Sequence, residues 1–290
     1  MNKLPAEKAF TIPAFLRIIR PGNLLILAFA QLMTAFFLVE HTQSGRPILE
    51  DFSLYILILS TVIIAASGYI INDYYDLKID YINKPDEVVI GKGMRRRVVM
   101  FLHSILNFIG IALAVLVNLK VGLVHFVAAF LLWWYSNSLK RLPLVGNLVV
   151  GALTGLAIWI IGFYYQQSQL LVLTYAIFAF FINLIREIIK DIEDREGDRK
   201  HGCRTLPIVL GFRSTKNIIF IIAGLFVISI LTVAYKINNP LLYYYFGALG
   251  VLFFLFMYKI YYADRKRHFT ELSLLSKILM LTGIISMGFL

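Results

Sequence analysis

The sequence predicts an all-α membrane protein, a bundle of nine transmembrane helices. Of its 290 residues, 59% are hydrophobic and 16% are charged, and the mean hydropathy is +0.77. Soluble domains carry more charge, about 25% of their residues. Apolar stretches long enough to cross a bilayer, roughly 17–25 residues each, recur along the whole chain. Lys and Arg gather in the short segments between these stretches, as they do in polytopic membrane proteins.

The apolar stretches define nine spans in chain order, with a tight turn near Lys120 between the third and the fourth. The predicted spans lie near 22–40, 52–72, 98–118, 121–138, 143–165, 170–189, 215–236, 240–262 and 271–290. No short apolar segment with a small-residue cleavage site opens the sequence, so we expect the first span to stay as an anchor. We expect 1–290 to form a single transmembrane domain.

Residues 1–21 precede the first span and mix apolar with basic side chains. Phe15, Ile18 and Ile19 stand among Lys8 and Arg17. Such a composition is typical of a helix that lies in the membrane interface with its apolar face toward the lipid. We therefore expect 1–21 to form an interfacial helix.

The distribution of Lys and Arg predicts the orientation in the membrane. The N-terminus and the segments after spans 2, 4, 6 and 8 hold nearly all of them. By the positive-inside rule these parts lie in the cytoplasm and the C-terminus lies outside. We expect the cell membrane as the location, with membrane lipid as a partner. The same rule accounts for the net charge of +11, so no nucleic-acid partner is predicted.

One carboxylate pattern, with spacing i, i+3 and i+7, occurs twice, each time at the end of a span. The two runs are Asp73, Asp76 and Asp80, then Asp191, Asp194 and Asp198. At about 100° per residue, these offsets fall within about 60° of one another on a helix, so each run aims three carboxylates one way. Acidic groups beside a membrane need a strong reason to be there. We expect them to bind divalent cations that neutralise a polyanionic ligand.

Hard carboxylate oxygens, with no competing His/Cys cluster, favour Mg²⁺, which is commonly shared with substrate phosphates. The predicted metal ligands are Asp73, Asp76, Asp191 and Asp194. The alternative is that both runs are solvated helix ends with incidental acidity. Two copies of the extended spacing at equivalent positions favour the metal site.

Basic residues follow each acidic run and would offset its repulsion of an anion. Lys84 follows the first run, Arg199 follows the second, and Lys140 closes the fourth span on the same side. Mg²⁺ with Lys and Arg around a phosphate stabilises charge on a departing phosphoryl oxygen. As a set they favour a diphosphate site, although the positive-inside rule explains each of them singly.

Polar residues that enter a span normally face a cavity or one another. We include several of them, and the outer acids, among the substrate-binding candidates. These are Asn23, Asn72, Asp80, Asn147, Lys190 and Asp198. Tyr135 lies near the acidic end of its span, where an aromatic face could stabilise a cation.

These motifs resemble those of the UbiA superfamily of intramembrane prenyltransferases. The stretches that carry the resemblance are 20–23, 72–80 and 191–207. The resemblance implies a helical bundle around a central cavity, with cytosolic cap loops and a lateral opening to lipid. It also implies Mg²⁺-dependent transfer of a prenyl group from a prenyl diphosphate to a lipophilic acceptor. Tyr135 and Lys140 resemble a Tyr–Lys pair of the family, which implies a catalytic role for both.

The stretches 68–74 and 186–194 look most like the subgroup that prenylates the hydroxyl of geranylgeranylglyceryl phosphate. Members with aromatic acceptors share the core motifs, so that acceptor class stays open. A cation-coupled transporter is the alternative of another class. Its acids would lie deep in the spans, often at broken helices, whereas here they lie at span ends.

Overall fold

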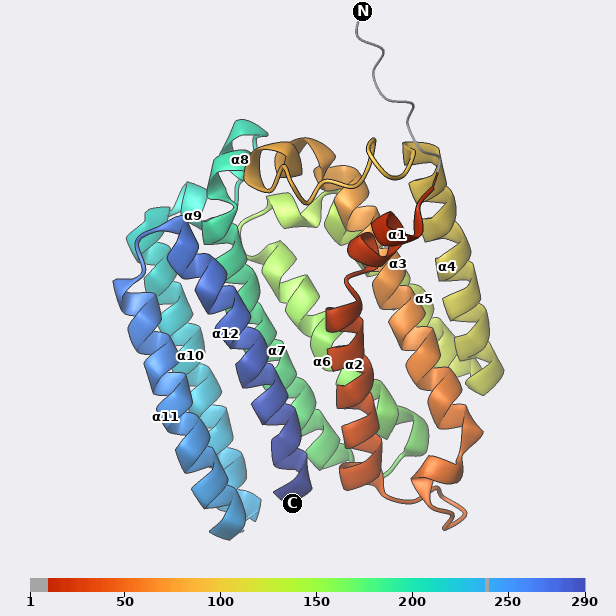
Figure 1. The fold of residues 1–290 in the computed structure, drawn as a ribbon. Coiled ribbons are helices and arrows are strands. Elements are labelled where there is room, and N and C mark those ends of the chain that lie inside the picture. The colour runs from red at the N-terminus through yellow and green to blue at the C-terminus, as the bar shows by residue number, and fades with distance from the viewer. Residues whose placement is uncertain (1–9, 238–239, 290) are drawn as a thin grey trace, which may run out of the picture. The chain divides into compact units, whose positions relative to one another are not determined.

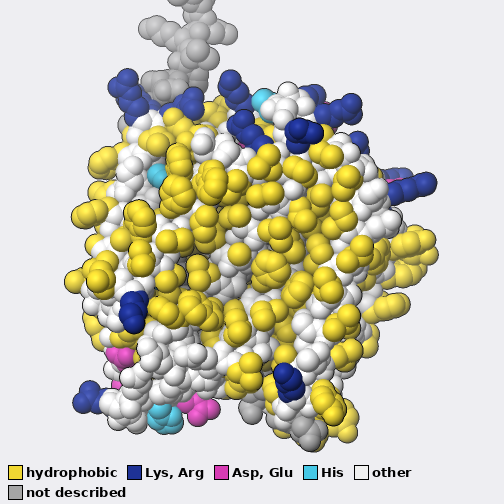
Figure 2. All heavy atoms as spheres, turned by 180° about the vertical axis from the view of Figure 1, so that it is seen from behind, with side chains coloured by type: hydrophobic (Ala, Val, Ile, Leu, Met, Phe, Trp, Pro, Cys, Tyr) yellow, Lys and Arg dark blue, Asp and Glu magenta, His cyan; other side chains and the backbone are white. Residues whose placement is uncertain are grey.

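The computed structural model describes residues 10–237 and 240–289 (Figure 1). Within them, nine helices are long and apolar enough to cross a membrane, which confirms the predicted nine spans. These are Pro21–Val39, Phe52–Asn83, Arg96–Val117, Leu119–Asn137, Val145–Tyr165, Gln169–Glu193, Gly211–Ile237, Tyr243–Tyr262 and Lys266–Phe289. On the face shown in Figure 2, hydrophobic side chains cover most of the surface, and most Lys and Arg side chains lie along its edges. This pattern suits helices whose middles face lipid.

The described chain divides into two compact units by its internal contacts. The first takes in Met1–Ala28 and Phe52–Leu139, and the second takes in Phe29–Asp51 and Lys140–Leu290. The first span, built from α2 (Pro21–Met33) and the π-helical η1 (Thr34–Val39), contributes to both units. The expectation of a single domain over 1–290 stays a prediction.

The first unit is built on α3 (Phe52–Asn83), which packs against α4 (Arg96–Val117) and α5 (Leu119–Asn137). Gly110 of α4 lets that helix approach α3, since a Cβ there would come within 2.8 Å of the Ile64 side chain. The predicted turn near Lys120 lies at Asn118, whose side chain caps α5 by accepting a hydrogen bond from the Lys120 backbone N–H at 2.8 Å.

α1 (Ile12–Ile19) precedes the first span and packs on α3 by one face. Ala14 and Ile18 are buried in a cluster with Ile70 of α3 and with apolar residues of the segment that follows α3. Ile12 and Leu16 are exposed. An apolar outer face suits a helix in the membrane interface. The helix occupies only 12–19 of the predicted 1–21, and residues 1–9 lie outside the described part.

The second unit packs its helices around α7 (Gln169–Glu193), which contacts five other α-helices of the unit. Its elements are η2 (Ile48–Glu50), η3 (Leu139–Arg141, which begins at the unit boundary), α6 (Val145–Tyr165), α8 (Arg195–Lys200), α9 (Leu206–Val209), α10 (Gly211–Ile237), α11 (Pro240–Tyr262), α12 (Lys266–Ile285) and η4 (Ser286–Phe289). Ile185, Ile188 and Ile189 of α7 join Ile219 of α10 and Phe269 of α12 in one buried cluster.

α6 and α7 run antiparallel and lie unusually close together. A Cβ at Gly155 would come within 2.7 Å of the Ala176 carbonyl oxygen, and one at Gly162 would come within 3.0 Å of Val172. Small residues at a helix interface allow such approach, and van der Waals packing is a main source of helix association in lipid. The pair therefore forms a firm support for the polar residues at its end.

Candidate active site

The first acidic run lies on one helix, as its spacing predicts. α3 continues unbroken past the predicted span end at residue 72 and stops only at Asn83. Asp73, Asp76 and Asp80 therefore occupy successive turns, and all three are partly buried. Asp80 lies within coulombic range of the other two. Asn72 immediately precedes the run, and Lys84 immediately follows α3, with its backbone N–H bonded to the Asp80 carbonyl at 2.8 Å.

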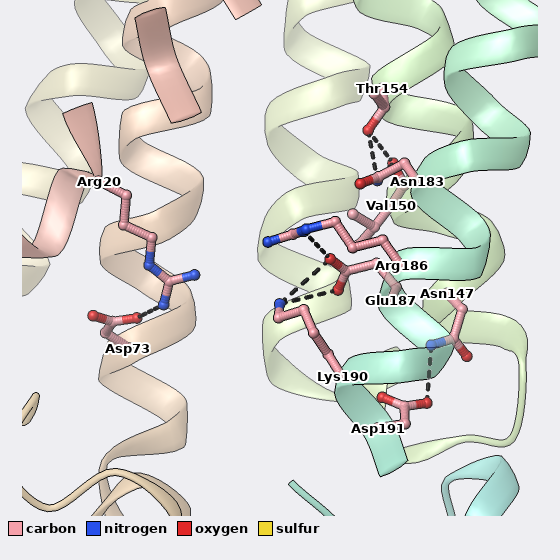
Figure 3. Close-up of polar contacts among 10 residues, drawn as sticks. All are labelled: Arg20, Asp73, Asn147, Val150, Thr154, Asn183, Arg186, Glu187, Lys190 and Asp191. Atoms are coloured by element: carbon pink, nitrogen blue, oxygen red, sulfur yellow. Dashed lines mark hydrogen bonds and ion pairs between the residues drawn. The ribbon is translucent and has the colours of Figure 1, made fainter. Parts of the chain in front are cut away.

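Arg20 supplies a cation to this run. Its Nη2 donates to Oδ1 of Asp73 at 2.7 Å (Figure 3), and its guanidinium lies 5.0 Å from the centroid of the Tyr69 ring. The Arg20 backbone is left-handed, with φ 53° and ψ 63°, a conformation that few residues with a Cβ adopt. Backbone strain of this kind clusters at functional sites.

Arg20 opens the motif at 20–23, but its contact with Asp73 was not predicted from the sequence. The signal lies in the dipeptide Arg20-Pro21. A residue before proline is restricted, and proline favours the first turn of a helix, so one helix must end and another begin at this point. At this junction between α1 and α2, the Arg20 side chain extends toward Asp73.

The basic segment between α3 and α4 is folded rather than extended. Val89, Ile90 and Met94 are buried against α1 and α3. Arg96, at the start of α4, stacks its guanidinium 4.7 Å from the ring centroid of Tyr74. Arg96 is thus held beside Tyr74, the residue that follows Asp73.

The second acidic run differs from the prediction of one continuous helix. α7 ends at Glu193 and α8 begins at Arg195, with Asp194 between them at φ −92° and ψ 4°. Acidic side chains oppose the helix dipole at a C-terminus and favour it at an N-terminus. The break moves Glu196 and Asp198 into the first turn of α8, where their charge is favourable.

Asp191, on the last turn of α7, is held by a residue of α6. Nδ2 of the buried Asn147 donates to Oδ2 of Asp191 at 2.9 Å (Figure 3). Asp191 is within coulombic range of Asp198, Glu187 and Lys190. Polar partners that orient a carboxylate tune its use as a metal ligand.

The remaining predicted residues occupy the ends of several elements. Lys140 lies in η3, which is tied to the segment after α8 because the Arg204 backbone N–H donates to the Arg141 carbonyl at 2.8 Å. Arg199 is exposed on α8. Asn23 lies in the first turn of α2, and Tyr135 lies in the last turn of α5.

The donors present fit Mg²⁺ that arrives with its substrate. In the described part of the chain, no three His, Cys, Asp or Glu side chains converge closely enough to hold a bare ion. Mg²⁺ usually takes one or two carboxylates and completes its shell with water and substrate phosphates. Each carboxylate run offers such oxygens within its own unit, with Arg20 paired to Asp73 in the first and Lys190 near Asp191 in the second.

Comparison with known proteins decides the family. A model described as the UbiA prenyltransferase family matches residues 28–278. The chain belongs to the UbiA prenyltransferase family. It is similar to a digeranylgeranylglyceryl phosphate synthase of Methanosphaera stadtmanae, with 33% identity over 94% of this chain and 97% of the relative. The same enzyme of Thermococcus gammatolerans is 36% identical over 69% of this chain and 70% of the relative.

Solved structures agree on the fold. A structure of digeranylgeranylglyceryl phosphate synthase superposes with a TM-score of 0.68 at 23% identity, over 95% of this chain and 96% of that one. A UbiA homologue from Archaeoglobus fulgidus, bound to DMAPP and Mg²⁺, gives 0.63 at 18% identity, over 95% and 99%. The predicted family, the all-α membrane fold and the prenyltransferase class are therefore confirmed. This UbiA family member is an integral membrane protein.

Proposed function

We propose that this UbiA family member transfers a geranylgeranyl group from its diphosphate to the hydroxyl of geranylgeranylglyceryl phosphate, with Mg²⁺ as cofactor. The observation that carries the proposal is the pair of carboxylate runs, each with cations in its own unit: Arg20 on Asp73, and Lys190 beside Asp191. Relatives with 33–36% identity are named digeranylgeranylglyceryl phosphate synthase, which supports this acceptor.

We assign Asp73, Asp76, Asp191 and Asp194 as the residues that would hold Mg²⁺, with Asp80 and Asp198 as outer acids of the same runs. When bound, Mg²⁺ would supply the positive charge that makes diphosphate a good leaving group. Asn147 orients Asp191 through its amide hydrogen bond. Lys84, Lys140 and Arg199 are assigned to the diphosphate oxygens, and Asn23, Asn72 and Lys190 are assigned to substrate binding.

In the proposed reaction, the allylic C–O bond breaks and its electron pair leaves with the diphosphate. The acceptor oxygen forms the new C–O bond and loses its proton. Tyr135 would present its ring to the developing cation, and the apolar side chains of the spans would keep out water that could capture the cation. We further propose that the reaction takes place at the cytoplasmic face of the plasma membrane, since the basic segments favour that side.

The test is product analysis by mass spectrometry with purified protein and geranylgeranyl diphosphate. An ether-linked product from geranylgeranylglyceryl phosphate, absent in EDTA, supports the proposal. A product only from 4-hydroxybenzoate, homogentisate or a dihydroxynaphthoate would refute the acceptor and leave the prenyl transfer standing. Asp76→Asn and Asp194→Asn should each lower turnover by orders of magnitude, and full activity in both would refute the role of the runs.

A further inference from the structure

Two cations share one carboxylate inside α7, before the second acidic run. Nη1 of Arg186 donates to Oε1 of Glu187 at 2.7 Å, and Nζ of Lys190 lies 3.3 Å from each Glu187 oxygen (Figure 3). The side chains of Arg186, Glu187 and Lys190 are only 14%, 8% and 24% exposed. All three lie in a span of the second unit.

Within this cluster, Arg186 has a buried donor that Glu187 does not accept from. A guanidinium has five N–H donors in a rigid fork, and Nε of Arg186 is buried with no acceptor among the described residues. Charge and donors of this kind are costly inside a span unless an anion or a cavity meets them.

The position of Arg186 along α7 separates it from the residues assigned to Mg²⁺. Arg186 precedes Asp191 by five residues, about 7.5 Å along the helix axis. Asp191 already accepts the Asn147 hydrogen bond and is assigned to the metal and the diphosphate. Arg186 therefore lies between one and two turns deeper in the span than Asp191.

The acceptor in the proposed function carries a second anion at a matching distance. Its phosphate and its attacking hydroxyl belong to one three-carbon glycerol, so the phosphate must stay about one helical turn, ~5 Å, from the reacting carbon. A guanidinium fork matches the geometry of phosphate oxygens, and Lys adds a compact charge.

We propose, resting on the proposed function, that Arg186 and Lys190 bind the phosphate monoester of the acceptor, with Glu187 as the positioning residue that keeps the two cations together. The site selects a phosphorylated acceptor over an uncharged one. An acceptor without the phosphate leaves the buried Arg186 donor unmatched, and a buried polar site discriminates strongly against a substrate that lacks its hydrogen-bonding partner.

The experiment compares the wild-type protein with Arg186→Gln and Arg186→Lys. Arg267→Gln is the matched control, because Arg267 also pairs with a glutamate of its own helix but is 87% exposed. Two quantities are measured: binding of geranylgeranylglyceryl phosphate in EDTA without donor, and the ratio of kcat/KM for this acceptor over geranylgeranylglycerol. Thermal unfolding in detergent checks that each variant folds.

We expect Arg186→Gln to weaken binding and to lower the ratio roughly 10- to 100-fold, the effect of lost hydrogen bonds to a charged group. Arg186→Lys should fall between, and Arg267→Gln should match wild type. If Arg186→Gln does not fold, the binding and the kcat/KM ratio of Arg186→Lys test the assignment. An unchanged ratio, an equal loss for both acceptors, or a raised KM for the donor instead would overturn the assignment. Wild-type protein that neither binds nor prenylates the phosphate acceptor would refute the proposed function itself.

Discussion

Replacing Asn147 by Leu tests whether the amide that holds Asp191 sets the affinity for Mg²⁺. The Nδ2–Oδ2 distance is 2.9 Å and Asn147 is buried, so water cannot easily substitute for the lost donor. A hydrogen bond to a charged group contributes about 1.5–3 kcal/mol. Loss of a residue that orients a metal ligand typically weakens metal affinity by about 10- to 100-fold, which agrees with that energy. We expect the Mg²⁺ concentration for half-maximal activity to rise by this factor.

The assay titrates Mg²⁺ at saturating prenyl diphosphate and follows product by mass spectrometry. Asn183→Leu is the matched control. Nδ2 of Asn183 donates to Oγ1 of Thr154 at 2.8 Å and to the Val150 carbonyl at 3.4 Å (Figure 3). It too joins α7 to α6, but its partners in the described part of the chain are not carboxylates. Both variants should lose thermal stability, and only Asn147→Leu should shift the Mg²⁺ requirement. Equal half-saturation in the two variants would show that the Asn147 bond merely holds the helices together.

Three further predictions concern other parts of the chain. Arg20→Gln should raise the KM for the prenyl diphosphate roughly tenfold, the effect of one charge-assisted hydrogen bond, and unchanged kinetics would remove Arg20 from the site. Gly155→Ala should destabilise the protein by about 1–3 kcal/mol in thermal unfolding, since its Cβ would meet an α7 carbonyl at 2.7 Å. Gly224→Ala is the control, because a Cβ there would meet nothing within 4 Å. Equal stability of the two variants would contradict the packing argument. A cysteine at Lys92, with Cys203 replaced by Ser, should react with an impermeant thiol reagent only from the cytoplasmic side, and labelling of intact cells would reverse the topology.

The number and order of the spans could be predicted because lipid imposes a simple rule. A bilayer-spanning helix must satisfy its backbone internally and present about 20 apolar residues, and both requirements are visible in sequence. The end of α3 could not be placed, because α3 continues through Asp73 to Asn83 after its apolar stretch ends. Hydropathy indicates which residues lie in the lipid, but it does not indicate where the helix ends.

The acidic runs could be found from spacing, but their partners could not. Arg20 and Asp73, or Asn147 and Asp191, are far apart in the chain, and no periodicity connects them. The break between α7 and α8 at Asp194 could not be predicted from the spacing either, because the i, i+3, i+7 pattern holds only for a continuous helix. That break follows from charge at a helix terminus, a local effect that competes with the i, i+3, i+7 pattern.

Because α6 and α7 pack so closely, a tilt at one end of the pair displaces residues at the other end. Gly162 of α6 faces Val172, near the start of α7. It lies about 22 Å along α6 from Asn147, at 1.5 Å per residue. A tilt of roughly 5° introduced there by a larger side chain would move the other end of the pair by about 2 Å over that length. Displacements of this size are enough to misplace a reacting group. Residues at the Gly162 end of the pair, distant from Asp191, can therefore affect the position of Asp191. Differences in turnover among related chains can arise from substitutions at that end of the helix pair.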